Sequence, residues 1–399
     1  MVVALGLGLN GGYALNYETL NGVTTQSVQA PSNLSTDFVP AANGSVVFLA
    51  EGTTENSMGG VWLMHSDGSV IELDSSSEDF QPSISYDGSK VVFGRYDPTS
   101  GRSGIYVINA DGTGLRLVVS SGPLNFVKLP TFSPDGGSIA YWCGPLDGTD
   151  NQSKTCGPLT DGSYRNSGVM RINADGSNPR MIVIAGGDPI LPDGPNGMSW
   201  SPDGQWIALD GALTVYLPGG AETAWGQLFA YHTDGSDLFN NADPSRQVTH
   251  ETDDDPGPIN PQFCGNSTQI LFEDAGTGAG TFVINRDGTG RHQVTLYPTG
   301  PYTPIGQPVC VLPASGDAPP PLVDATHITV PSLHALGAKA AKRKLRADNL
   351  SVGKVTYRYS PSVRKNRVLS QRPKAGAVAH RIQKIGPRVN LVLSRGRHR

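Results

Sequence analysis

The chain of 399 residues has few cysteines and few charged side chains, and it lacks long hydrophobic runs. Charged residues make up 16 % of it, where about 25 % is usual in a globular protein. This low charge argues against a coiled coil, a charge-rich disordered chain and a mostly helical protein. No segment approaches the roughly 18 consecutive apolar residues of a transmembrane helix, so we expect a chain that does not span the membrane.

Several short motifs that mark common chemistries are also missing. The eight histidines form no His-x-His or His-x-x-x-His pair and no Cys-x-x-Cys occurs, so we expect no metal centre. A Gly-x-Ser-x-Gly nucleophile turn and a phosphate-binding loop are absent too. We therefore expect neither a serine hydrolase nor a bound cofactor.

What the chain has in excess is glycine and proline. It contains 50 Gly and 31 Pro, well above the usual shares of about 7 % and 5 %. These residues favour turns, so a turn-dense, all-β fold is expected.

The modest net charge of −5 hides a strong asymmetry. Residues 326–399 hold 18 Lys and Arg but a single acid, Asp348, which gives +17. The other residues hold 12 basic and 34 acidic side chains, which gives −22. Segments of opposite sign present different fields to their partners and indicate separate modules.

Asp-Gly and Asn-Gly pairs recur between apolar segments, which is the strongest short-range signal for a β-hairpin. Two series interleave along the chain. The first is centred on Asn43, Asp87, Asp135, Asp203 and a degenerate copy at Asn266, and the second on Asp67, Asp111, Asp175, Asp234 and Asp287. We interpret these Asp residues as formers of type I′ turns, in which both central residues have positive φ, and assign them no catalytic role.

Each unit predicts a four-stranded antiparallel meander. Successive copies of the first series lie 44, 48, 68 and 63 residues apart, and four-stranded repeats of about 40–50 residues are typical of propeller blades. Five units span residues 38–300, and residues 302–311 predict the inner strand of a sixth. With residues 13–29 this strand would form a composite blade that closes a six-bladed ring, with seven blades as the alternative.

The first residues allow two interpretations. Residues 2–9 are apolar, and small residues follow at 12–14 as before a signal-peptidase site, although no basic segment stands in front. The alternative is a short buried strand. A signal peptide that begins upstream of Met1 would reconcile the two.

Two repeats contain a Ser-Pro-Asp-Gly box, at residues 132–136 (FSPDG) and 200–204 (WSPDG), followed by Ile-Ala and later by an Ile/Val-x-x-Asp-Gly motif. On these motifs the chain resembles the TolB-like propeller family over about two-thirds of its length. It departs from the pattern at Ala42-Asn43 and at residues 264–266. The resemblance implies an exported, mostly non-catalytic binding scaffold, although some relatives cap peptidases or act as polysaccharide lyases.

Residues 317–328 form a Pro-rich linker that begins the change in composition. Beyond it, apolar residues at helical spacing predict a helix over 336–350, and strands are expected at 353–359, 367–371 and 389–394. We therefore divide the chain into a signal segment or closing strands (1–30), a propeller (31–316), the linker, and a small α+β domain (329–399).

The motifs of this last domain run from Val330-Pro331 through VGKV at 352–355 and QRPKAG at 371–376 to VNLVLSRG at 389–396. On them the segment resembles a PASTA domain along its whole length. Ala335 and Asn366 stand where Gly is usual, so two turns are expected to differ. Such domains occur on bacterial cell-wall kinases and penicillin-binding proteins, where they contact peptidoglycan, which implies an extracytoplasmic, bacterial protein.

The positive charge of this domain favours peptidoglycan or an anionic wall polymer as a partner. The alternative is ordinary solvated charge. Nucleic acid is not expected, because the segment has only two aromatic residues and no nucleic-acid-binding motif. The predicted wall-binding face consists of Lys342, Arg343, Arg346, Arg364, Lys365 and Arg367.

Three consecutive carboxylates, Asp253, Asp254 and Asp255, precede the inner strand of the fifth unit. At a mouth of the ring they would bind a cation or a basic ligand. The alternative is a solvated loop held by Asx-turn hydrogen bonds.

Four cysteines in an exported chain predict two disulfides, with three connectivities open from the sequence. Cys143 and Cys156 lie in one insertion of the third unit, and Cys264 and Cys310 lie on the inner strands of neighbouring units. We favour these two pairs, and the alternative is free buried thiols.

The sequence thus predicts a monomeric, extracytoplasmic, cell-wall-associated binding protein. Its propeller would bind a protein or glycan and its PASTA-like domain peptidoglycan. One alternative is a polysaccharide lyase that works in the central funnel and is targeted to the wall by the same domain. A secreted adhesive repeat protein is another.

Overall fold

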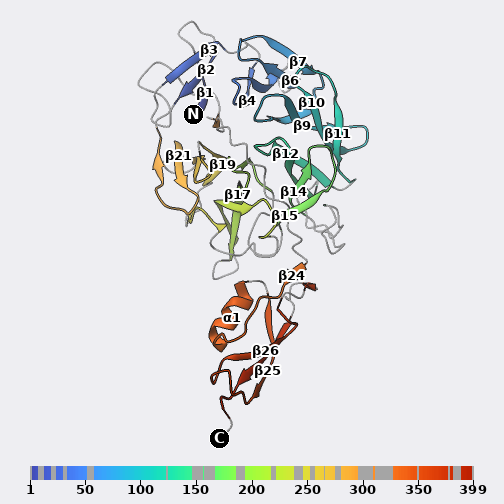
Figure 1. Cartoon of the computed structure of the whole chain (residues 1–399). Helices are drawn as coiled ribbons and strands as arrows, with labels where there is room; N and C mark the ends of the chain where they lie inside the picture. Colours follow the sequence, from blue (N-terminus) through green and yellow to red (C-terminus); the bar gives the residue numbers. More distant parts are fainter. Residues whose placement is uncertain are drawn as a thin grey trace. The chain divides into compact units, whose positions relative to one another are not determined.

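The computed structural model divides the chain into two compact units, Met1–Leu322 and Val323–Arg399 (Figure 1). We describe each unit by itself. The structure describes residues 2–7, 13–18, 24–29, 34–51, 58–122, 125–145, 156, 167–185, 194–216, 222–237, 246–251, 257–264, 266–274, 280–294, 309–310, 327–347, 350–375, 378–380 and 388–397.

The described part of the N-terminal unit consists of antiparallel sheets that follow one another along the chain, five of four strands and one of three. Each of the predicted five units forms one sheet. These are β4 (Leu34–Pro40), β5 (Val46–Glu51), β6 (Met58–Met64) and β7 (Val70–Asp74); β8 (Asp79–Ile84), β9 (Lys90–Asp97), β10 (Arg102–Asn109) and β11 (Arg116–Ser120); β12 (Asn125–Phe132), β13 (Ser138–Pro145), β14 (Ser167–Asn173) and β15 (Arg180–Ala185); β16 (Met198–Trp200), β17 (Trp206–Tyr216) and β18 (Glu222–His232); and β19 (Pro258–Phe263), β20 (Gln269–Asp274), β21 (Gly280–Asn285) and β22 (His292–Gln293).

The remaining sheet combines both ends of this unit. Its order is β23 (Val309–Cys310), β1 (Val2–Leu7), β2 (Tyr13–Glu18) and β3 (Thr24–Gln29). Val2 and Val3 pair with Cys310 and Val309 in antiparallel register. The structure has a strand at Val2–Leu7, and residues 8 and 9 of the apolar segment lie outside the described residues.

The hairpin turns follow a regular hydrogen-bonding pattern. In the β8–β9 hairpin, Gly88 N–H donates to Ser85 O, and Asp87 Oδ1 accepts from Ser89 N–H at 3.0 Å. Only the Gly has a positive φ, 73° at Gly88, and the Asp before it does not. The expectation of type I′ turns was therefore wrong: the Asx hydrogen bond holds the Asp in an ordinary conformation and a single Gly supplies the left-handed position.

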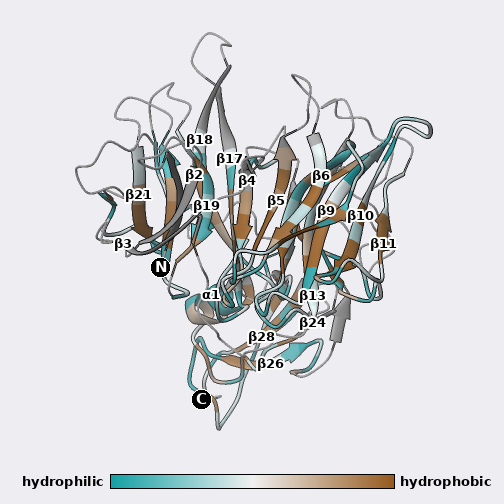
Figure 2. Cartoon of the chain, turned by 90° about the horizontal axis from the view of Figure 1, so that it is seen from above, coloured by the Kyte–Doolittle hydropathy of each residue, from teal (hydrophilic) through white to brown (hydrophobic). Residues whose placement is uncertain are grey.

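Apolar side chains pack between neighbouring sheets. One cluster joins the β4–β7 and β8–β11 sheets through Leu49, Leu63 and Phe93, and another joins the β12–β15 and β16–β18 sheets through Trp200 and Tyr231. Figure 2 shows the hydrophobic colour on strands such as β5 and β10 and the hydrophilic colour on many connecting turns. These four sheets thus bury faces against their neighbours, as a single meander cannot do alone.

The C-terminal unit is a small α+β fold. Its helix α1 (Ala338–Ala347) packs on a sheet of β25 (Ser351–Arg358), β28 (Arg388–Ser394) and β26 (Val368–Arg372), in which β25 and β28 are parallel. A second, two-stranded sheet pairs β24 (His327–Thr329) with β27 (Val378–His380). Burial of Ala341 and Leu345 against Leu391 forms part of the core.

The two positions at which Gly is usual keep a left-handed backbone. Ala335 has a φ of 61° and Asn366 a φ of 64°. Both residues lie beside the start of α1, where Ala335 N–H donates to Val368 O and Asn366 O accepts from Ala338 N–H. The conformation that glycine would adopt is retained there without glycine.

Candidate functional site

The first strands of all six sheets of the N-terminal unit line one cavity of about 310 Å³. These strands are β4, β8, β12, β16, β19 and β23, and the loop residues just before β16 contribute as well. Strands from separate repeats therefore converge on a single space, which makes it the candidate binding site of this unit.

Three residues of the cavity wall share an unusual backbone conformation. Gln81, Leu129 and Asn260 have φ values of 48°, 54° and 54°, and each stands directly before a proline. At each of them the ladder to the second strand of the sheet is interrupted by a register shift. Left-handed non-glycine residues cost roughly 1–3 kcal/mol each and cluster at binding sites.

Hydrogen bonds between neighbouring sheets hold this wall in place. Leu129 N–H donates to Gln81 Oε1 at 2.9 Å, and Cys310 N–H donates to Gln262 Oε1 at 2.8 Å. Phe263 N–H donates to Ser199 Oγ at 3.0 Å. Because each bond joins first strands of adjacent sheets, the cavity wall is preorganised.

The described part of the cavity wall carries no charged side chain. Among the described residues that line it, Tyr86 is the one titratable group, and burial raises the pKa of its phenol. The polar groups of the wall are amides and hydroxyls, which both donate and accept hydrogen bonds. This arrangement can bind a ligand through hydrogen bonds and apolar contacts but offers no charge to pair with.

A buried carboxylate supports one part of the wall. Asp210, on β17, accepts from Asn196 N–H at 2.9 Å, from Asn196 Nδ2 at 3.0 Å and from Gly197 N–H at 2.8 Å. Asp210 is 1 % exposed, and its burial raises the pKa of its carboxyl group despite these bonds. It fixes the segment that carries Asn196, an exposed residue of the cavity wall.

A second charged group lies beside Gln81. Arg95, on β9, donates from Nε to Asp79 Oδ1 at 2.6 Å and pairs through Nη2 with Asp74 Oδ1 at 2.5 Å. Burial raises the pKa of Asp79 to about 7 against the opposing effect of Arg95. Burial also acts to raise the pKa of Asp74, but hydrogen bonds from Arg95 and Ser76 hold it below its usual value.

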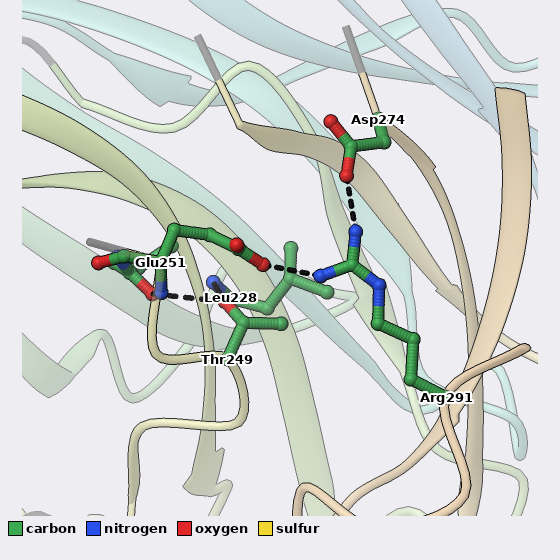
Figure 3. Close-up of polar contacts among 6 residues, drawn as sticks. Leu228, Thr249, Glu251, Asp274 and Arg291 are labelled. Carbon is green, nitrogen blue, oxygen red and sulfur yellow. Dashed lines mark hydrogen bonds and ion pairs between the residues drawn. The ribbon is translucent and has the colours of Figure 1, made fainter. Parts of the chain in front are cut away.

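A third charged group consists of Glu251, Asp274 and Arg291 (Figure 3), and Glu251 precedes the predicted acidic site in the sequence. Arg291 bridges the carboxylates of Glu251 and Asp274. The buried side chain of Gln227 holds the backbone at residues 249–251: it donates a hydrogen bond to Glu251 O at 3.0 Å and accepts one from Thr249 Oγ1. Asp253, Asp254 and Asp255 lie outside the described residues, so their role as ligands stays a prediction.

The Asp residues assigned to turns all make the same contact. Each accepts, through Oδ1, a hydrogen bond of 2.8 to 3.0 Å from the backbone N–H two residues on; these are Asp87, Asp111, Asp135, Asp175, Asp203, Asp234 and Asp287. Their carboxylates are thereby engaged in local structure.

Both favoured disulfides are present. Cys143 bonds to Cys156, and Cys264 bonds to Cys310. The second bond joins Cys264, the residue after β19, to β23 in the sheet that combines both ends of this unit, and Cys310 lines the cavity.

The basic residues singled out in the C-terminal unit fall into two segments that meet. Lys342 and Arg343 are exposed on α1, and Arg364, Lys365 and Arg367 are exposed before β26. Arg367 pairs with Gly337 in a β-bridge and donates to Ala335 O at 2.8 Å, which brings the second segment to the start of α1. The side chain of Arg346 lies outside the described residues.

Sequence reasoning missed two features of the sites. The Gln-Pro, Leu-Pro and Asn-Pro pairs recur six residues before the Asp-Gly or Asn-Ser pair of their repeats, and this spacing was a visible signal. The exposed Tyr357 and Tyr359, the latter under Arg395 with 5.7 Å from Cζ to the ring centroid, were noted only as aromatic residues.

Among the described residues, no group of three or more His, Cys, Asp or Glu side chains is arranged to hold a metal ion. Within the same part of the chain, the helix is too short to cross a bilayer.

Comparison with solved structures finds several similar chains. TolB from Acinetobacter baumannii is 15 % identical with a TM-score of 0.47, over 77 % of this chain and 66 % of that one. A putative TolB from Agrobacterium tumefaciens is 18 % identical with a TM-score of 0.44, over 67 % and 82 %. The extracellular region of the Ser/Thr kinase PrkC from Staphylococcus aureus is 27 % identical with a TM-score of 0.15, over 17 % and 22 %.

Comparison with curated proteins finds no match to this chain. Comparison with family models matches residues 328–395 to the PASTA domain. The matched residues cover the helix and the sheets of the C-terminal unit, which agrees with the resemblance seen in the sequence. The C-terminal unit of this chain therefore contains a PASTA domain.

Proposed function

We propose that this chain is an exported, cell-wall-associated binding protein. Its PASTA domain attaches to peptidoglycan or another anionic wall polymer, and its N-terminal unit is a six-bladed propeller that binds a protein or glycan in its central cavity. The observation that carries the proposal is the match of residues 328–395 to the PASTA domain.

The charge of the chain supports attachment through this domain. Residues 326–399 carry 18 basic side chains and one acid, and Lys342, Arg343 and Lys365 are exposed. A surface of this kind attracts polyanions through a screened, salt-sensitive interaction.

The pairing of β1 with β23 supports a closed ring, because it joins the two ends of the N-terminal unit in one sheet. The two disulfides support export, since such bonds form and persist in oxidising surroundings. We place the protein outside the cytoplasm on these grounds.

Sedimentation with purified cell wall tests the proposal. The full chain should sediment with the wall and a chain of residues 1–325 should stay in the supernatant. Added salt should release the full chain, because ionic strength screens its attraction to the wall. Equal sedimentation of the two chains would overturn the proposal.

A matched control separates general charge from the predicted face. Changing Lys342, Arg343 and Lys365 to Glu should weaken sedimentation with the wall. Changing Arg102, Arg116 and Arg180 of the N-terminal unit to Glu should leave sedimentation with the wall unchanged.

A further inference from the structure

We propose that the cavity of the N-terminal unit is a site for an uncharged saccharide of one or two sugar rings. The inference rests on the proposed function and narrows its unnamed ligand to one chemical class. It is drawn from the neutrality of the cavity wall, the hydrogen-bonding groups on it and the prolines along its strands.

The uncharged character of the described wall favours a neutral ligand. Among the residues that the structure describes, those that line the cavity include no Lys, Arg, His, Asp or Glu. An anionic or cationic ligand would lose its hydration there without gaining a partner of opposite charge, which is costly. An anionic sugar polymer such as a uronate chain is therefore disfavoured.

The polar groups of the wall match hydroxyl groups. Gln81 and Gln262 use their side-chain oxygen to accept a backbone N–H from the next sheet, which holds each amide in place and leaves its NH₂ group to donate. Thr131 and Ser199 add hydroxyls that both donate and accept. Sugar hydroxyls, which also donate and accept, are suited to such a mixed lining.

The strands that line the cavity are poorly suited to a peptide. An extended peptide binds a strand edge by continuing its ladder of backbone hydrogen bonds. Here Pro82, Pro130 and Pro261 lack the N–H donor, and the ladder to the second strand of each sheet shifts register at the left-handed residue before the proline. Three of the six first strands thus carry the features by which proteins block the addition of a strand.

Size and apolar contacts agree with a small sugar. A volume of about 310 Å³ lies at the lower end of the range of about 300–1,000 Å³ for small-molecule sites. Val39, Leu129 and Met198 are partly exposed on the wall and offer apolar contacts for the C–H faces of a sugar ring. The strained backbone at Leu129 is typical of a wall shaped for a ligand.

Binding of four soluble probes to the full chain, measured by calorimetry, tests the inference. The probes are chitobiose, cellobiose, digalacturonate and a blocked, uncharged alanine-glutamine peptide. We expect at least one of the two neutral disaccharides to bind, and neither digalacturonate nor the peptide. Preferential binding of digalacturonate or the peptide would overturn the inference, and so would no binding of any probe at about 10 mM.

Variants at one cavity residue locate the binding. Met198→Lys should lower the affinity for the disaccharide by at least about tenfold, because it adds an unpaired charge to the wall. Met198→Leu should leave that affinity within about threefold of the unchanged protein's. Leu117→Lys places the same charge on the exposed strand β11 and should change nothing. Unchanged affinity in Met198→Lys, with a thermal unfolding transition like that of Met198→Leu, would contradict the inference.

The outcome is separable from that of the proposed function. Sedimentation with the wall reports on residues 326–399, whereas binding of a soluble disaccharide reports on the cavity. If the chain sediments with the wall but binds no disaccharide, only this inference is overturned. If it binds the disaccharide but does not sediment with the wall, only the proposed attachment to the wall is overturned.

Discussion

Two arginines of the N-terminal unit make the same contacts in different surroundings. Arg95 bridges Asp74 and Asp79, and Arg291 bridges Glu251 and Asp274. Each lies over a cross-strand aromatic pair: Arg95 Cζ is 5.4 and 4.7 Å from the ring centroids of Phe93 and Tyr106, and Arg291 Cζ is 5.3 and 4.9 Å from those of Phe272 and Phe282.

Burial distinguishes the two groups. The side chain of Asp79 is 0 % exposed and that of Arg95 is 20 % exposed, whereas Arg291 is 32 % exposed and its partners Glu251 and Asp274 are 22 % and 13 % exposed. In the group of Arg95, burial raises the pKa of Asp79 to about 7. We therefore expect the burial of the carboxylates, more than the set of contacts, to determine how much each bridge contributes to the free energy of unfolding.

The largest effect is expected from removing the buried bridge. Arg95→Met leaves Asp79 buried without its cation and should lower the free energy of unfolding by about 3 kcal/mol. Urea denaturation measures this change. A loss no greater than that of Arg291→Met would show that burial of the acid does not matter.

The pH dependence of stability should come from the buried group. Asp79 has a raised pKa in the folded state, so folding takes up a proton and stability falls as pH rises from its usual value of 3.8 towards about 7. Asp74 acts in the opposite direction, since its pKa is lowered and its contribution is lost when pH falls below 3.8.

Thermal unfolding at several pH values checks this assignment. Asp79→Asn should flatten the decline between about pH 4 and 7, while Asp274→Asn in the exposed group serves as the matched control. An unchanged profile in Asp79→Asn would assign the decline to another group.

The smallest effect is expected from the exposed bridge. Arg291→Met should lower the free energy of unfolding by about 1 kcal/mol or less. Solvent screens the two ion pairs of Arg291, and the contact of Arg291 with the two rings is partly exposed. The difference between this variant and the wild type should shrink in high salt. A salt-independent loss as large as that of Arg95→Met would make the two groups equivalent.

The sheets of the N-terminal unit were predictable because their signals are local. An Asp-Gly pair between apolar runs marks a hairpin wherever it occurs, and its repetition marks each sheet. The pairing of Cys264 with Cys310 followed from counting equivalent strands. In the C-terminal unit, the positions of Ala335 and Asn366 were recognised, but their retained left-handed backbone was not.

The contacts of the site were less predictable, because they join residues that no periodic pattern relates. Nothing in the sequence shows that Asp74 and Asp79 share Arg95, or that Gln81 accepts from the backbone of the next repeat. The type of turn also depended on one hydrogen bond from Asp to the N–H two residues on. Spacing alone does not reveal such a bond.

The Cys264–Cys310 disulfide has a mechanical consequence. A chain held to the wall by its C-terminal unit would carry tension into the N-terminal unit from its C-terminal side. In the described part of the chain, that side ends at Cys310 of β23, where two residues pair with β1. The covalent bond to Cys264 would share this load with the residue that follows Phe263 of the cavity wall, in addition to the hydrogen bonds between the strands.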